Sequence, residues 1–321
     1  MQVTVAVVSW NTRELLRDCL DSLAPDAAAG VAEVWVHDNA STDGSAELVA
    51  ADYPWVRLIA APDNVGFGAA VNAVATRTRR RGRPEWLAAA NADTALTPGA
   101  LRALIDAGRH DPRAGALAPR LLLPDGSTQH SIHPFPGVWA ALAFNAGLTT
   151  LSPRLADRLT LDGHWDPSRS RRVDWAHGAF VLFRRSAFDA VGGFDPHQFL
   201  YAEDIDLAWR LAQTGAYTRY VPAALVRHRH GAAIAQLYGA DRDLQAQRSA
   251  YAWLLRRRGS AAMRSTALLN AIGAGVRATS ATLRGRSHPP TGGLAAWQLR
   301  RQTRMHLEGL LSPRARLEAH R

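Results

Sequence analysis

The chain has 321 residues, 47% of them hydrophobic, which suffices for one large domain or two modest ones. All 38 basic residues are arginine and the formal net charge is +10, which favours polyanionic partners such as nucleic acid, an anionic membrane face or a phosphorylated substrate. The single cysteine excludes an intrachain disulfide, and no uncharged apolar run approaches the roughly 20 residues of a membrane-spanning helix. Because MQVTVAVVSWNT also lacks the pattern of a secretory signal, we expect a cytoplasmic protein.

Residues 1–123 alternate short apolar runs with helical patterns. The runs that we predict as strands are VTVAVVS (3–9), EVWVHD (33–38), WVRLIA (55–60), WLAAANAD (86–93) and GALAPRLLL (115–123). Strands that alternate with helices predict an α/β fold with a mostly parallel, Rossmann-like sheet flanked by helices. Ligands of such sheets bind at the carboxyl ends of the strands.

Three of these strands end in small polar or acidic residues, which we expect to gather at one edge of the sheet. These residues are Ser9 and Asn11, Asp38 and Asn39, and Asn91 and Asp93. A carboxylate such as Asp38 can accept hydrogen bonds from the base or ribose of a nucleotide. Capping of the next helix explains the serine, threonine and aspartate at 41–43, but it explains Asp38 less well.

The loop DNVGFGAAVNAV (63–74) places Gly66 and Gly68 where a helix begins, so its backbone could approach a ligand closely. It lacks the last glycine of a dinucleotide fingerprint, and Asn64 could simply cap the helix. Asp93, at the end of an apolar run, could hold a divalent cation that neutralises a diphosphate. Capping of the helix in ALTPGALRALI is the alternative role of Asp93.

Residues 124–172 are interrupted by proline and glycine and are predicted as a connection with short helices. A strand, VDWAHGAFVLFRR (173–185), follows, and a second strand, YTRYVPAALVRH, ends at His228. Between them, apolar residues at i, i+3, i+4 and i+7 predict a helix that begins near Glu203 and stops at Gly215. Beyond residue 236 the pattern is helical and basic, with a linker predicted at 285–293.

Two groups in this second half could carry chemistry. Glu203 and Asp204 open the predicted helix, where the helix dipole favours ionised carboxylates, as a general base requires at neutral pH. Acids in a first helical turn are also common without any function. His228 and His230 end the predicted strand, and either could complete a metal site or be structural; their spacing does not rank them.

Seven sequence segments follow one another along the chain in this order: VVSWNT, HDNASTDGS, DNVGFGAAVN, AAANADT, GAFVLFRRSAFDAVGGFD, FLYAEDIDLAWRL and YVPAALVRHRHG. Together they resemble the family 2 inverting glycosyltransferases, particularly the rhamnosyltransferase-like branch that extends bacterial surface glycans. The resemblance covers about residues 3–233. It implies a GT-A fold, with a nucleotide-sugar-binding half (1–123) and an acceptor-binding, catalytic half (124–235) in one domain. Residues 236–321 would form a helical, basic extension.

The resemblance also implies roles for individual residues. The donor nucleotide sugar would contact Ser9, Asn11, Asp38, Asn64, Gly66, Asn91 and Asp93. Asp93 and His228, which lies 24 residues after Asp204, match the ligands of a divalent metal, Mg²⁺ or Mn²⁺. Asn91-Ala92-Asp93 stands where relatives often carry two acids or Asn-Pro-Asp.

Asp204 matches the catalytic base of these relatives, and Glu203 would contact the acceptor or hold the pocket, with Trp175 and Gly178 also binding the acceptor. The reaction expected is inverting transfer, in which Asp204 takes the proton of an acceptor hydroxyl as that oxygen attacks the anomeric carbon. Relatives indicate dTDP-rhamnose or a UDP-sugar as donor. The acceptor would be a glycan, a glycolipid or a natural product.

Two other classes of protein fit parts of the sequence. A nucleotidyltransferase would share the sheet and metal but would need a basic, glycine-rich loop after the first strand, which SWNTRELLR does not provide. A noncatalytic module for membrane or nucleic acid fits the arginine clusters, but these lack the interleaved aromatic residues of a nucleic-acid platform. The catalytic and membrane-binding functions could also occur in one protein: residues 240–321 could dock a catalytic domain on the inner face of the plasma membrane, where lipid-linked acceptors reside.

Overall fold

The computed structural model describes residues 1–79, 84–145, 152–161, 163–198, 201–229, 242–283 and 296–311. The chain divides into two compact units, 1–133 with 166–239 and 134–165 with 240–321. This division differs from the predicted boundaries at 123 and 235, because the connection after residue 133 belongs with the C-terminal helices. His230 and the predicted linker at 285–293 lie outside the described residues.

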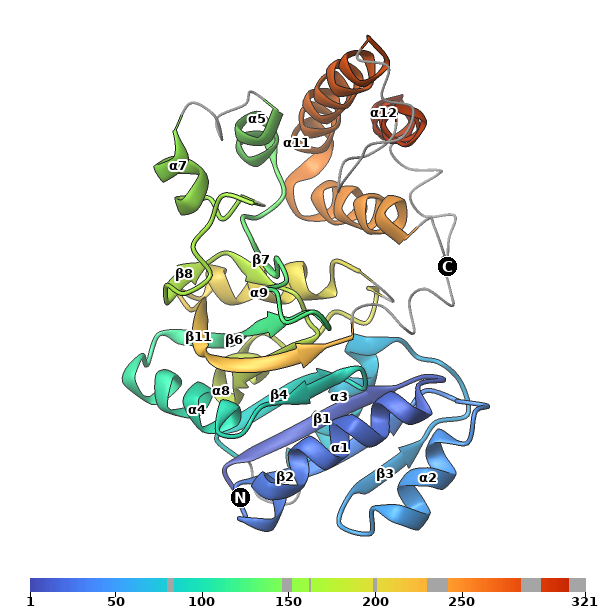
Figure 1. The fold of residues 1–321 in the computed structure, drawn as a ribbon, viewed down its shortest axis with the longest axis vertical. Helices are drawn as coiled ribbons and strands as arrows, with labels where there is room; N and C mark the ends of the chain where they lie inside the picture. Colours follow the sequence, from blue (N-terminus) through green and yellow to red (C-terminus); the bar gives the residue numbers. More distant parts are fainter. Residues whose placement is uncertain are drawn as a thin grey trace. The chain divides into compact units, whose positions relative to one another are not determined.

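In the described part of the first unit, a nine-stranded sheet runs in the order β3-β2-β1-β4-β10-β6-β11-β5, with β8 also paired to β11 (Figure 1). Its strands are β1 (Val3–Ser9), β2 (Ala32–Asp38), β3 (Arg57–Ala60), β4 (Trp86–Asn91), β5 (Thr94–Leu96), β6 (Ala114–Leu122), β8 (Arg171–Val173), β10 (Phe180–Arg184) and β11 (Tyr217–His228). Strands β1 to β4 pair in parallel, as do β6 and β11, while β10 lies antiparallel between β4 and β6. The predicted mostly parallel sheet is therefore confirmed.

Helices cover both faces of this sheet. They are α1 (Arg13–Ala28), α2 (Ser45–Asp52), α3 (Phe67–Arg79), α4 (Ala100–His110), α8 (Arg185–Ala190) and α9 (Glu203–Gln213). Alternate residues of a strand point to opposite faces, so β1 contributes Val5 and Val7 to a core with α1, α2 and α4, and Ala6 to a second core with α3, α8 and α9. The strand–helix alternation read from the sequence is what produces this layered arrangement.

Tertiary contacts change two of the predicted strands. The predicted strand 173–185 is interrupted: β9 (Trp175–Ala176) pairs with β7 (Ile132–His133) in a separate ribbon, and β10 begins only at Phe180. Strand β5, which the sequence analysis did not separate from the preceding run, pairs antiparallel with the end of β11. Helix α4 begins at Ala100 with Gly99 as its N-cap, so Asp93 does not cap that helix.

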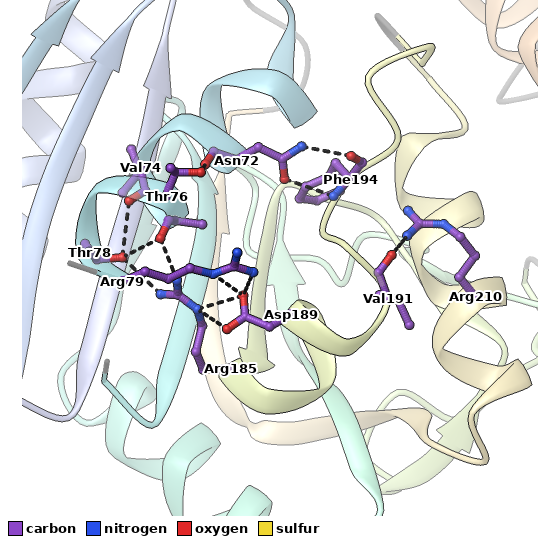
Figure 2. Close-up of polar contacts among 11 residues, drawn as sticks. Asn72, Val74, Thr76, Thr78, Arg79, Arg185, Asp189, Val191, Phe194 and Arg210 are labelled. Carbon is purple, nitrogen blue, oxygen red and sulfur yellow. Dashed lines mark hydrogen bonds and ion pairs between the residues drawn. The ribbon is translucent and has the colours of Figure 1, made fainter. Parts of the chain in front are cut away.

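A buried polar network ties α3 to α8 and to the loop that follows α8 (Figure 2). The fully buried Arg185 guanidinium donates to both carboxylate oxygens of Asp189 and to the Thr78 hydroxyl, and Arg79 also pairs with Asp189. Asn72 exchanges two hydrogen bonds with the backbone of Phe194, at 2.8 and 3.0 Å. The network thereby anchors the segment that leads into α9, on which the acidic pair lies.

The second unit is helical, as predicted for the C-terminal region. Its helices are α5 (Val138–Asn145), α7 (Pro153–Arg158), α11 (Arg242–Leu283) and α12 (Ala296–Leu311). The Asn145 side chain donates to Asn270 at 3.0 Å and accepts from Arg277 at 2.9 Å, which joins α5 to α11. Tyr251 and His306 join α11 to α12 across 2.7 Å. Among the described residues, no helix combines the length and apolar character that crossing a bilayer requires.

Candidate active site

The carboxyl ends of β1 and β2 bring together the first two groups of predicted donor-binding residues. Ser9 is the register partner of Asp38, and its carbonyl accepts the Asn39 amide at 2.8 Å. Asp38 is only 2% exposed, and its Oδ1 accepts the Ser41 amide at 2.8 Å. Its buried Oδ2 has no hydrogen-bond partner among the described residues. A buried acceptor without a donor is costly, so this oxygen suits a ligand hydroxyl such as that of a ribose.

Two loops complete this edge of the sheet. Asn11 has a left-handed backbone, with φ of 50°, and its Oδ1 accepts the Thr42 amide at 2.8 Å, so the loop after β1 is fastened to the loop after β2. Asn64 Oδ1 accepts the Gly66 amide at 3.0 Å, and the Gly66 carbonyl accepts from Asn39 Nδ2 at 3.5 Å. The sequence-predicted residues Asn11, Asn64 and Gly66 therefore lie on loops that meet beside Asp38.

Asp93 lies in the turn after β4, at the next position along the same edge. The Ala92 amide donates to the Val8 carbonyl at 3.2 Å, which holds the turn against β1. Asp93 is 8% exposed, and its carbonyl accepts the Arg229 amide at 2.9 Å. Because Thr94 of β5 is the register partner of His228, the Asp93 Oδ1 and His228 Nε2 atoms lie 3.3 Å apart.

This pair fits a divalent cation. Two adjacent ligands of an octahedral Mg²⁺, each about 2.1 Å from the ion, are separated by about 3.0 Å, close to the separation observed here. A carboxylate oxygen and an imidazole nitrogen are both suitable donors. Within the described ranges no third His, Cys, Asp or Glu joins the pair. Magnesium sites of this kind use one or two carboxylates, with substrate phosphates and water completing the shell.

The acidic pair opens α9 after a sharp turn in which Tyr201 and Ala202 have positive φ. Asp204 is half-buried, and its carboxylate accepts the Gly178 amide at 3.1 Å and the Ile205 amide at 2.8 Å. Burial raises the pKa of Asp204 to about 6, while these two hydrogen bonds oppose the rise. At neutral pH Asp204 is therefore ionised, with a pKa close to the working range of a general base.

Glu203 behaves differently from its neighbour. It is 7% exposed, and burial, together with the negative charge of Asp204, raises its pKa well above the usual range of a glutamate. Burial therefore works against the ionised form that the start of the helix was expected to favour at Glu203. The dipole of one helix end does not outweigh the loss of hydration in this position.

A short backbone path connects the two acidic sites. Gly178, which donates to Asp204, is followed by Ala179, whose carbonyl accepts the Asn91 amide at 2.8 Å. Asn91 in turn lies two residues before Asp93. The segments that carry Asp204 and Asp93 therefore meet at the carboxyl end of β4.

Of the three residues predicted to bind the acceptor, Glu203 is described above. Gly178 lies against Asp204, while Trp175 stacks on His133 with ring centroids 4.6 Å apart. The structure adds Gln129 and His177 to this region, which the sequence analysis did not single out. His177 directly precedes Gly178, and that adjacency was a usable signal. Gln129 lies in the stretch without clear periodicity, where no local pattern marked it.

Comparisons with known proteins agree with this arrangement. Residues 1–242 match the family described as "Glycosyltransferase like family 2". The N-acetylglucosaminyl-diphospho-decaprenol L-rhamnosyltransferase of Mycobacterium tuberculosis is 36% identical over 231 residues, 70% of this chain and 75% of that protein. Rhamnosyltransferase WbbL of Escherichia coli is 53% identical over 51 residues, 16% of this chain and 19% of that protein.

Among solved structures, the mannosyltransferase PcManGT from Pyrobaculum calidifontis, in complex with GDP-Man and Mn²⁺, has a TM-score of 0.58 at 19% identity. The similarity covers 98% of this chain and 88% of that chain. It confirms the predicted GT-A fold.

Proposed function

The chain belongs to the family 2 glycosyltransferases, and on that premise we propose that it transfers a sugar from a nucleoside-diphosphate donor to an acceptor hydroxyl with inversion at the anomeric carbon. The convergence of an ionised Asp204 with the Asp93–His228 pair carries the proposal. Asp204 suits an incoming hydroxyl, and the Asp93–His228 pair suits a departing diphosphate.

In the proposed reaction, Asp204 accepts the proton of the acceptor hydroxyl while that oxygen bonds to the anomeric carbon. The bond from that carbon to the diphosphate oxygen breaks, and the nucleoside diphosphate leaves on the opposite face. Amides of Gly178 and Ile205 hold the Asp204 carboxylate in place. Burial and the negative charge of Asp204 raise the pKa of Glu203, so Asp204 is the better candidate for the base. A cation bound by Asp93 and His228 would supply positive charge to the leaving diphosphate.

The relatives suggest the substrates. We propose dTDP-rhamnose as the first candidate donor and UDP-sugars as the next, with a lipid-linked sugar as acceptor, Mg²⁺ or Mn²⁺ as cofactor, and a place in cell-wall glycan biosynthesis. The Mycobacterium and Escherichia relatives described above are both named rhamnosyltransferases, and the Mycobacterium protein is named for a diphospho-decaprenol acceptor.

A direct assay tests this proposal. The purified protein is incubated with each nucleotide sugar and a polyprenyl-diphosphate-linked N-acetylglucosamine, with Mg²⁺, with Mn²⁺ or with EDTA, and the glycolipid product is identified by mass spectrometry. We expect transfer from one donor, abolished by EDTA, with inverted configuration at the new linkage. Transfer with retention would contradict the assignment of a single base, and metal-independent transfer would contradict the role of Asp93 and His228.

The second unit suits contact with an anionic membrane, where such an acceptor resides. Helix α11 exposes apolar side chains at Leu268, Ile272 and Val276, the last two at 55% and 65%, and α5 exposes Trp139 at 82%. Spacings of four residues place the three α11 residues on one face of the helix. Arginine 264 is exposed on the same helix, and arginines favour anionic lipid surfaces.

Vesicle co-sedimentation tests this surface. Ile272→Glu removes an apolar contact with the bilayer and adds a negative charge that anionic lipids repel. Binding to vesicles rich in phosphatidylglycerol should therefore weaken roughly tenfold or more. Trp55→Glu, at an exposed apolar residue of the other unit, is the matched control and should bind as the wild type does. Equal binding by the wild type and Ile272→Glu would refute this role for α11.

A further inference from the structure

A chain of four polar contacts leads from the interior of the first unit to Asp93. It runs His133 Nε2 to His177 Nε2 (3.0 Å), His177 Nδ1 to Gln129 Nε2 (3.5 Å), Gln129 Oε1 to His228 Nδ1 (2.7 Å) and His228 Nε2 to Asp93 Oδ1 (3.3 Å). Of these groups, only Asp93 and His228 have a role in the proposed reaction. Gln129 and His177 touch neither the acidic pair's carboxylates nor the donor-binding loops in the contacts described above.

Backbone pairing holds the middle of this chain in place. Gln129 is 6% exposed, and its amide donates to the Leu121 carbonyl at 2.9 Å, beside the end of β6. The His177 amide donates to the Ser131 carbonyl at 2.9 Å, next to the β7–β9 ribbon. The two side chains are therefore presented by paired backbone, which limits how far either can move.

The Gln129 side-chain amide determines which atom donates and which accepts in each of these contacts. Its carbonyl oxygen can only accept, so the proton shared with His228 lies on Nδ1 of that ring. Its NH₂ group donates toward His177 Nδ1, so a neutral His177 carries its proton on Nε2 and donates it to His133. Burial lowers the pKa of His133 well below the usual value, and the neighbouring His177 and His130 act in the same sense, so that ring is neutral and can accept.

The position of the proton on His228 determines what its Nε2 atom presents to Asp93. In the Nδ1–H tautomer, His228 directs the lone pair of Nε2 toward the carboxylate of Asp93. Two electron-rich atoms at this distance repel one another unless positive charge lies between them. We propose that Gln129, supported by His177, is a positioning residue that holds His228 in the Nδ1–H tautomer and aims Nε2 at a divalent cation shared with Asp93. The inference rests on the proposed function of the Asp93–His228 pair.

Metal ligands of this kind depend on the group that holds the other ring nitrogen, and losing that group typically lowers metal affinity 10- to 100-fold. Two substitutions separate this effect from packing. Gln129→Met keeps the length of the side chain but removes the acceptor for Nδ1–H. Gln129→Glu keeps the acceptor, and its carboxylate should bind the Nδ1 proton at least as well.

The experiment measures Mn²⁺ binding to the full chain by the loss of the free-ion electron paramagnetic resonance signal, with dTDP or UDP present and absent. Gln129→Met should bind Mn²⁺ 10- to 100-fold more weakly than the wild type, and Gln129→Glu within about threefold of it or more tightly. Thermal unfolding of each variant shows whether it is folded. Wild-type affinity in Gln129→Met would overturn the inference, and so would an equal loss in both variants, which would indicate packing alone.

His228→Ala separates this inference from the proposed function. If His228→Ala does not weaken Mn²⁺ binding, the proposed metal site is wrong; if it does while Gln129→Met does not, only the positioning role fails. A second readout needs no bound metal: nitrogen-15 spectra of the His228 ring should show the Nδ1–H tautomer in the wild type and its loss in Gln129→Met. An Nε2–H tautomer in the wild type would overturn the inference.

Discussion

The contrast between the two adjacent acids gives the sharpest prediction. Asp204→Asn removes the group that accepts the acceptor's proton. Glu203→Gln replaces a carboxyl whose raised pKa favours the protonated form by an amide of the same shape that can still donate a hydrogen bond. Removing a positioned base costs about 10²- to 10⁴-fold in rate, or about 2.7 to 5.5 kcal/mol in the barrier. Glu203→Gln should retain activity within roughly tenfold, since it leaves the base in place.

The assay is steady-state release of the nucleoside diphosphate across a range of pH, with donor binding followed separately by calorimetry. Because Asp204 must be ionised to act, wild-type activity should rise with pH through a pKa of about 6, and Glu203→Gln should keep this limb. Asp204→Asn should bind the donor as the wild type does. If Glu203→Gln loses as much activity as Asp204→Asn, or if the acid limb is absent, the assignment of the base is wrong.

Three further outcomes follow from the structure. Because the pKa of Asp204 is raised from 3.8 to about 6 in the folded state, ionising this carboxyl lowers the free energy of unfolding by about 1.4 kcal/mol per pKa unit as the pH rises through that range. Asp204→Asn cannot ionise, so it should unfold at a higher urea concentration than the wild type at pH 7.5, although it loses one acceptor. At pH 4 it should have no such advantage. Equal urea midpoints at pH 7.5 would contradict the raised pKa. Asp38→Asn should weaken calorimetric binding of dTDP or UDP about 10- to 100-fold, because the buried Oδ2 acceptor is lost, and unchanged binding would remove Asp38 from the donor site. Arg185→Met should lower the free energy of unfolding by about 3 kcal/mol in urea titrations, since it removes the buried ion pair between Arg185 and Asp189, and an unchanged midpoint would show that this pair adds no stability.

Much of the fold could be predicted from the sequence because its signals are local. Period-2 and near-continuous apolar runs identify β1, β2 and β4, and the parallel-sheet rule then places Ser9, Asp38 and Asp93 at one edge. The 3.6-residue periodicity likewise places the acidic pair at the start of α9, although the helix buries Leu207 and Leu211 more fully than the predicted Trp209. The order of the seven motifs pointed to the family that the comparisons show.

Other features depend on contacts between residues far apart in the chain, which local patterns do not contain. The predicted strand 173–185 is broken because the Gly178 amide turns to Asp204 in place of a neighbouring strand. His228 meets Asp93 through the short pairing of β5 with β11, a contact between residues far apart in the chain.

Both acids begin the same helix and burial raises both pKa values, but the Gly178 and Ile205 amides lower that of Asp204, while the negative charge of Asp204 raises that of Glu203 further. Gln129 acquires its place beside His228 only when a segment without periodicity folds against the end of β6. The sequence by itself determined the layers of the sheet and which edge carries the polar side chains, since these follow from periodicity and chain direction. The tertiary structure alone decided how deeply those side chains are buried and which distant groups share hydrogen bonds with them, because both depend on contacts between residues far apart in the chain.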